Sequence, residues 1–128
     1  MLPIAEQITF LYTRDIAASA RFYEEVLGLE LALDQGGCRI YHMVGRKAYL
    51  GICLRELPRT PDGVIFTVVT PNVDAWYEHI TGHGIPCDNA PRVTPEYGIY
   101  HFFVRDPNGY LIEFQRFLAD PWDQSLSS

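Results

Sequence analysis

The sequence predicts an α+β fold built from two tandem βαβββ modules. Three pairs of segments repeat: 40–44 and 99–104, which both begin Ile-Tyr-His; Asp15-Ile16 and Asn72-Val73; Tyr49-Leu50 and Tyr110-Leu111. Their offsets of 59, 57 and 61 residues are nearly constant, so the copies differ by short insertions. A fixed internal period indicates a duplicated supersecondary unit. One copy alone, at about 60 residues, is marginal in size, so the two copies should share a core.

The first module is predicted as a strand, a helix and three further strands. Residues 7–13 are β-branched and aromatic, as strands prefer. Asp15 can cap a helix over 16–27 by accepting backbone N–H bonds, and Gly28 can adopt the left-handed conformation that ends it. The remaining strands are expected over 29–34, 38–44 and 47–55.

The second module repeats this order. A strand is expected over 64–69, and then a helix that Asn72 caps and that ends at Gly82 and Gly84. The strand signal between 87 and 93 is weak, whereas 98–104 and 110–117 should form a hairpin around Asp106-Pro107-Asn108-Gly109. The predicted organisation is a first module over 1–57, a linker over 58–63, a second module over 64–118 and a loose tail over 119–128.

Charge and cysteine content exclude several classes of protein. The net charge is −6 and the basic residues are scattered, which disfavours nucleic acid as a partner. Cys38, Cys53 and Cys87 are odd in number and lack a Cys-x-x-Cys spacing, which predicts reduced thiols, with Cys53 packed under the helix. No run approaches the ~20 apolar residues of a membrane span. We therefore expect a soluble, cytoplasmic protein without a membrane partner.

Two motifs carry a family resemblance. One is the Asp15-to-Gly28 helix, with Phe22-Tyr23 ahead of Val26-Leu27-Gly28, and the other is segment 103–114, Phe-Val-Arg-Asp-Pro-Asn-Gly-Tyr-Leu-Ile-Glu-Phe. In this order they resemble the vicinal oxygen chelate superfamily, which groups glyoxalases, bleomycin-resistance proteins and extradiol dioxygenases. The match spans residues 6 to 118. The resemblance implies that the mixed sheets form a cup-shaped cleft with the helices on the outer face.

The resemblance also implies where metal-using members hold a divalent ion. Residues of the first and last strand of each module supply the ligands, and the corresponding positions here are Ile8, Ile52, Ile65 and Glu113. Three isoleucines and one carboxylate offer too few donors for a divalent cation. We therefore expect no metal and no cofactor, which disfavours a metal-dependent enzyme.

An aromatic cup is the predicted binding site. Strand alternation places Phe10 and Tyr12 beside Ile8 on the inner face. A regular turn over 106–109 would set Glu113 opposite Phe102, with Tyr100 on the same face and Tyr41 added by the repeat. The predicted ligand contacts are Ile8, Phe10, Tyr12, Tyr41, Ile52, Ile65, Tyr100, Phe102 and Glu113. Such a cup suits a small aromatic or cationic molecule.

Binding a small molecule without catalysing a reaction resembles what antibiotic-sequestering members do. Related folds often complete the cup across two chains, so we expect a homodimer.

Three alternatives to this function remain. In the first, Glu113 pairs with an arginine such as Arg39 or Arg105 instead of contacting a ligand. The chain could be a lyase, isomerase or dioxygenase, with displaced metal ligands or with Glu113 alone as base. It could also serve protein association. His42 and His101 are predicted to face the helices as structural residues.

Overall fold

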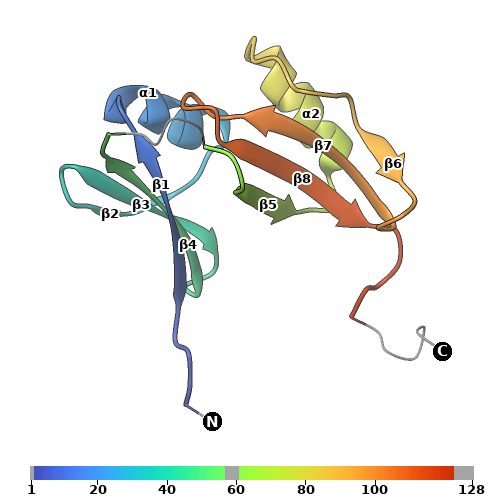
Figure 1. The fold of residues 1–128 in the computed structure, drawn as a ribbon, viewed down its shortest axis with the longest axis horizontal. Coiled ribbons are helices and arrows are strands. Elements are labelled where there is room, and N and C mark those ends of the chain that lie inside the picture. Colours follow the sequence, from blue (N-terminus) through green and yellow to red (C-terminus); the bar gives the residue numbers. More distant parts are fainter. Residues whose placement is uncertain (1, 57–60, 123–128) are drawn as a thin grey trace. The chain divides into compact units, whose positions relative to one another are not determined.

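The computed structural model describes residues 2–56 and 61–122 and divides into two compact units (Figure 1). The first unit is Met1–Gly63 with Asp106–Tyr110, and the second is Val64–Arg105 with Leu111–Ser128. The predicted α+β class and the βαβββ order of both modules are confirmed. The predicted linker residues 58–60 and tail residues 123–128 lie outside the described part of the chain.

The first unit contains one mixed sheet of four strands in the order β1-β4-β3-β2. Its elements are β1 (Gln7–Thr13), α1 (Ile16–Ala20), the π-helical η1 (Arg21–Val26), β2 (Leu31–Asp34), β3 (Cys38–Val44) and β4 (Ala48–Leu54). As predicted, the Asp15 carboxylate caps the helix by accepting the Ala18 N–H at 3.1 Å. Gly28 follows with φ 71°, a conformation that costs glycine little.

The second unit repeats this topology with the order β5-β8-β7-β6 (Figure 1). Its elements are β5 (Ile65–Val69), α2 (Val73–Gly82), β6 (Arg92–Thr94), β7 (Ile99–Arg105) and β8 (Leu111–Phe117). The helix begins where predicted and Asn72 is its N-cap residue, whose backbone carbonyl accepts the Trp76 N–H at 3.0 Å, but the Asn72 side chain makes no capping hydrogen bond. The weak strand signal over 87–93 corresponds to β6 and to an isolated bridge between Cys87 and Val104.

Each sheet has a core on the face that its helix covers. In the first unit Tyr23 of η1 stacks on Tyr41 of β3, with ring centroids 6.1 Å apart, and both side chains are fully buried. In the second unit the Trp76 ring of α2 lies 5.1 Å from the Phe114 ring, measured between ring centroids. The Tyr77 ring lies 5.4 Å from the Phe102 ring in the same way. We call the opposite face of each sheet, which is turned away from its own helix, the far face.

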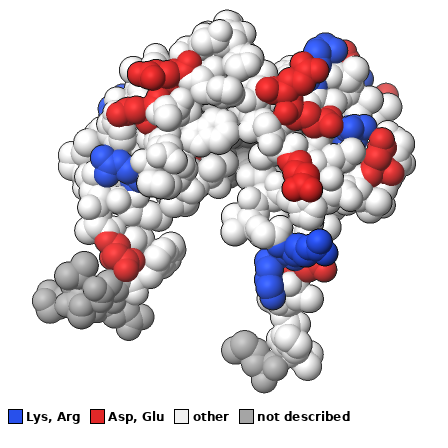
Figure 2. Space-filling model, turned by 180° about the vertical axis from the view of Figure 1, so that it is seen from behind, with Lys and Arg blue, Asp and Glu red and all other residues white. Residues whose placement is uncertain are grey.

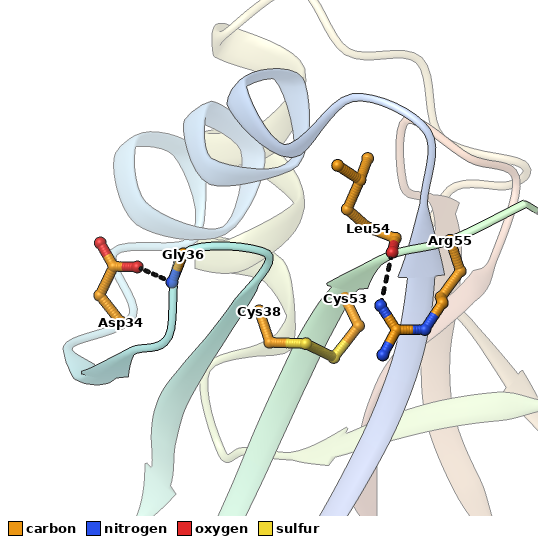
Figure 3. The surroundings of a disulfide bond; sticks show 6 residues. All are labelled: Asp34, Gly36, Cys38, Cys53, Leu54 and Arg55. Carbon is orange, nitrogen blue, oxygen red and sulfur yellow. Dashed lines mark hydrogen bonds between the residues drawn. A yellow bond between two sulfur atoms is a disulfide. The ribbon is translucent and has the colours of Figure 1, made fainter.

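The prediction of reduced thiols is wrong for two of the three cysteines. Cys38 of β3 and Cys53 of β4 form a disulfide, as Figure 3 shows, and Cys87 is the free thiol. The two cysteines are direct partners in the antiparallel register, with Cα atoms 4.1 Å apart. Cys53 is also level with Tyr12 of β1, so it lies on the far face and not under the helix. Sequence spacing alone could not reveal this, because the register brings the cysteines together.

Reduction of this disulfide should destabilise the protein. The bond closes a loop with a sequence separation of 15, and a loop of this size restricts the unfolded chain by about 3 kcal/mol. We expect urea unfolding with and without a reductant to differ by about that free energy. The Cys38→Ser/Cys53→Ser variant is the control, since its unfolding should not respond to reductant. An equal response of wild type and variant would contradict the prediction.

Charged side chains of both signs are interspersed over the described residues of the face shown in Figure 2. None of the helices in residues 2–56 and 61–122 combines the length and hydropathy that a bilayer crossing requires.

Candidate functional site

A chain of four hydrogen-bonded side chains crosses the far face of the second sheet. Thr67 Oγ1 donates to Glu113 Oε1 at 2.8 Å, and His101 Nδ1 lies 2.7 Å from Glu113 Oε2. The other ring nitrogen, His101 Nε2, lies 2.7 Å from Thr94 Oγ1. Each strand of the sheet contributes one member, in the order β5, β8, β7 and β6. We call this set, Thr67, Glu113, His101 and Thr94, the polar chain.

Strand register assembles the polar chain. Thr67 is the direct partner of Glu113 in the parallel β5–β8 pair, and cross-strand partners project to the same face. Gln115, two residues further along β8, is the direct partner of His101. Because side chains alternate along a strand, Glu113 and Gln115 share a face and His101 joins them.

The bonding pattern fits one arrangement of donors and acceptors. A carboxylate only accepts hydrogen bonds, and a proton on His101 Nδ1 would be donated to Glu113. In the neutral ring Nε2 is then an acceptor, and the Thr94 hydroxyl can donate to it. Glu113 and His101 are 8% and 6% exposed, and both carboxylate oxygens already hold one donor. The expected alternative pairing with arginine is absent from the described residues, where Arg39 pairs with Glu24 and Asp34, and Arg105 with Asp88.

Apolar side chains surround the polar chain on this face. Ile65 and Val69 of β5 flank Thr67 and are 55% and 60% exposed. Phe103 is the direct partner of Glu113, and its ring meets the His101 ring at 5.2 Å in an edge-on arrangement. A buried carboxylate that is bordered by exposed aliphatic groups can contact both the polar and the apolar part of a small molecule.

The predicted placement of Tyr100, Phe102 and His101 is wrong. Glu113 pairs with Phe103 and not with Phe102, because the β7–β8 loop uses five residues, Asp106–Tyr110, where four were expected. A shift of one residue moves every side chain of a strand to the other face. Phe102 therefore packs under α2, Tyr100 donates to Asp74 of α2 at 2.5 Å, and His101 lies on the far face.

In the first sheet the structure separates the predicted contact residues. Ile8, Phe10 and Tyr12 lie on the far face with 40, 48 and 41% exposure. The predicted inward placement of Ile52 and Tyr41 is wrong, since both are buried on the helix-covered face, Ile52 beside Leu11.

The error at Ile52 comes from an offset that is one residue too short. Phe10 partners Gly51 as Thr67 partners Glu113, so Gly51, not Ile52, corresponds to Glu113. The Phe10 ring lies where a Cβ atom at Gly51 would be, so a larger residue there would collide with it.

Tyr41 belongs to a polar cluster under the helix instead of to a binding face. Its hydroxyl donates to Glu24 at 3.1 Å, and Arg39 approaches both residues. Burial and the Glu24 contact raise the pKa of Tyr41 to about 12, although the Arg39 hydrogen bond opposes this. Tyr41 is thus a neutral, structural residue.

His42 also lies on a far face, contrary to prediction. It is the direct partner of Tyr49, which is level with Ile8, and the His42 and Tyr49 rings are 5.3 Å apart. These side chains line a depression of about 420 Å³, which Glu6 and Arg46 border. The depression belongs to the first unit alone.

Neither unit by itself offers donors that fit the divalent ion implied by the resemblance. In the second unit Ile65 carries an aliphatic side chain and both Glu113 oxygens are engaged by Thr67 and His101. In the first unit the corresponding positions, Ile8 and Gly51, offer no donor atom. In the part of the chain that the structure describes, no three His, Cys, Asp or Glu residues are grouped so that they could hold a metal.

Sequence reasoning missed His101 and Thr94 as site residues and did not use Gln115. A signal was available in β7 and β8, where apolar residues alternate as Phe102 and Val104, and as Ile112 and Phe114. Matching these two apolar stripes on one face requires Phe102 opposite Phe114, which is the observed register.

Comparison with known proteins agrees with this architecture. The family model of the Glyoxalase/Bleomycin resistance protein/Dioxygenase superfamily matches residues 5–114. A glyoxalase/bleomycin resistance protein/dioxygenase from Nocardioides has a TM-score of 0.72 at 22% identity, covering 94% of this chain and 87% of that one. A lactoylglutathione lyase from Agrobacterium tumefaciens has a TM-score of 0.70 at 27% identity, covering 89% and 94%.

An integron cassette protein from the mobile metagenome of a Halifax Harbour sewage outfall has a TM-score of 0.75 at 18% identity, covering 88% of this chain and 97% of that one. No curated protein sequence matches. The family model covers most of the chain and agrees with the two βαβββ modules. The chain therefore belongs to the glyoxalase/bleomycin resistance protein/dioxygenase superfamily.

Proposed function

We propose that this protein binds a small aromatic or cationic molecule without a metal ion, and that the far face of the second sheet is its contact surface. The observation that carries the proposal is the polar chain. It holds one carboxylate, Glu113, in a fixed position between exposed aliphatic side chains. Preorganised polar groups of this kind orient a ligand while apolar contacts supply affinity.

Simple energetics indicate why the carboxylate matters. Covering roughly 300 Å² of apolar ligand surface contributes about 7 kcal/mol at ~25 cal/mol/Å². Association costs about 4 kcal/mol or more, which leaves millimolar affinity. A hydrogen bond to a charged group adds about 1.5–3 kcal/mol, and this moves the dissociation constant towards the micromolar range.

The contact residues of the proposal differ from those predicted from sequence. Glu113 and Ile65 remain proposed contacts on the far face of the second sheet. Ile8, Phe10 and Tyr12 lie on the far face of the first sheet, which is a separate candidate surface. Ile52, Tyr41 and Phe102 are withdrawn because they are buried on the helix-covered faces, and Tyr100 is withdrawn because its hydroxyl donates to Asp74 of α2.

The Glu113→Gln variant tests the proposal. We expect protein treated with EDTA to bind at least one of benzamide, benzamidine and aniline, with the dissociation constant measured by ligand-observed NMR. The variant should weaken that binding about tenfold or more, since it removes a charged acceptor. Asp88→Asn is the matched control, because Asp88 is exposed and pairs with exposed Arg105. If binding is lost on metal removal, or if Glu113→Gln binds as wild type does, the proposal fails.

A metal-dependent or Glu113-based lyase, isomerase or dioxygenase is the second candidate. The Glu113–His101 pair favours it, since a carboxylate and an imidazole in contact can exchange a proton with a substrate. The lactoylglutathione lyase at 27% identity points the same way. Elemental analysis of protein purified without chelators separates the two candidates. Stoichiometric Mn, Fe, Ni or Zn would reject the metal-independent binder.

Three further proposals concern the biological setting. We propose that the protein forms a homodimer, and sedimentation analysis of its mass in solution tests this. We also propose that it sequesters an antibiotic, and growth assays of a strain whose gene is inactivated test this. The third proposal is a cytoplasmic location, against which the Cys38–Cys53 disulfide counts, because disulfides persist mainly in oxidising compartments. Thiol alkylation in intact cells would decide whether this bond exists there.

A further inference from the structure

We infer that Gln115 and Glu113 together recognise a neutral, planar amide group of the ligand, such as a carboxamide or a urea. The inference rests on the proposed binding function and specifies the polar group that this face accepts.

The feature that supports this inference is the side-chain amide of Gln115. Its side chain lies on β8 and is only 9% exposed. Among residues 2–56 and 61–122 it has no side-chain hydrogen bond, whereas Asn108 donates to Thr13 and Ser19, and Asn89 accepts the Phe103 N–H. Buried side-chain amides are normally hydrogen-bonded, so an unpartnered one needs an explanation.

The Gln115 amide is nevertheless accessible at its tip. No buried side-chain nitrogen or oxygen in the described residues lacks a hydrogen-bond partner. Because the Gln115 amide has none, its polar atoms must reach the surface of the far face. Its carbon stem is thus buried and fixed, while its donor and acceptor atoms are free for a ligand.

Register places this amide beside the carboxylate. Glu113 and Gln115 alternate with Phe114 on β8 and project to the same face, about 7 Å apart along the strand. Gln115 is level with Val69 on β5 and with His101 on β7. A planar group that is hydrogen-bonded at both ends, with about 2.9 Å for each bond, spans this separation.

The two side chains have complementary requirements. Glu113 only accepts, whereas the Gln115 amide both donates and accepts. A ligand group with N–H donors and a carbonyl oxygen satisfies both at once. An amidinium offers donors alone and leaves the Gln115 N–H without a partner, and a carboxylate ligand would be repelled by Glu113.

Charge on this face also favours a neutral group. The Glu113 carboxylate already accepts bonds from Thr67 and His101. Arg92 of β6 is the direct partner of His101 and lies on the same face, exposed. Since a cationic residue is already present, the face does not require a positive charge from the ligand.

A series of probes with one common ring tests the inference. Binding of benzamide, benzamidine and benzoate to the full chain is measured by ligand-observed NMR. We expect wild type to bind benzamide most tightly. Gln115→Leu should raise the dissociation constant of benzamide about tenfold, equivalent to about 1.4 kcal/mol, and should change that of benzamidine by no more than about twofold. Gln115→Met is a second variant in case leucine disturbs folding, and Gln7→Leu, which alters an exposed amide on β1, is the control.

The outcomes separate this inference from the proposed function. If benzamidine binds more tightly than benzamide, and Glu113→Gln but not Gln115→Leu reduces binding, the amide inference is overturned while the proposed function stands. If none of the three probes binds wild type, this inference is overturned, and the proposed function then depends on aniline alone.

Discussion

Replacing Phe102 by alanine is expected to lower the free energy of unfolding by about 3 to 5 kcal/mol. The Phe102 side chain is fully buried, its ring stacks on Phe114 with centroids 5.2 Å apart, and Tyr77 of α2 meets it edge-on at 5.4 Å. Removing the ring leaves a cavity under α2 that the sheet cannot easily close. Urea unfolding followed by circular dichroism measures the loss.

Phe103→Ala is the matched control, because Phe103 is the same residue type on the same strand but on the far face. It is only partly buried, so its replacement should cost clearly less than that of Phe102. The pair of variants tests the strand register directly. A larger stability loss for Phe103→Ala would mean that the faces are reversed and that Phe102 is a ligand contact after all.

Replacing Asp106 by alanine should lower the free energy of unfolding by at least about 3 kcal/mol, because at least three donors lose their acceptor, each at about 1–3 kcal/mol. The fully buried Tyr23 donates its hydroxyl to Asp106 Oδ2 at 2.8 Å, and the N–H groups of Asn108 and Tyr110 donate to Oδ1 at 2.9 Å. Burial and the neighbouring Asp106 raise the pKa of Tyr23, so its hydroxyl keeps its proton. Asp88→Ala, at an exposed ion pair, should cost less than about 1 kcal/mol in the same unfolding assay.

Asp106 should also make stability depend on pH. Burial raises the pKa of Asp106 above its ordinary value of 3.8, although hydrogen bonds from Tyr23 and the backbone oppose the shift. The folded protein therefore holds this proton more tightly than the unfolded chain does. The resulting stabilisation is complete below the unfolded value and is lost as the pH rises through the raised pKa.

Asp106→Asn, which cannot ionise, removes this dependence. Unfolding free energies of wild type and variant, measured from about pH 3 to pH 7, should give a difference that shifts against wild type as the pH rises. A difference that stays constant, or that shifts in favour of wild type, would contradict the raised pKa.

Much of the fold follows from local sequence. The helix cap at Asp15, the left-handed Gly28 and the alternation of β1 are short-range features, and all three appear as predicted. The repeat of about 57 to 61 residues likewise predicted two copies of one topology. Such features need no knowledge of distant contacts, since neighbouring residues determine them.

The candidate site could not be predicted from local sequence features alone. Glu113 was identified because its position within β8 follows from the repeat and the closing motif. Its partners depend on how β7 pairs with β8, and the extra loop residue, Tyr110, reverses the face on which Tyr100, His101 and Phe102 lie. The same sensitivity misplaced Ile52 and Tyr41 in the first module.

The sequence by itself determined the module order and the family motifs. Only the tertiary structure decided that Glu113 joins His101, that Gln115 lies beside them without a side-chain hydrogen bond to any described residue, and that Cys38 meets Cys53. The physical reason is that side chains in a strand alternate with a period of two. One residue of uncertainty in a loop leaves the strand intact but exchanges its buried and exposed faces.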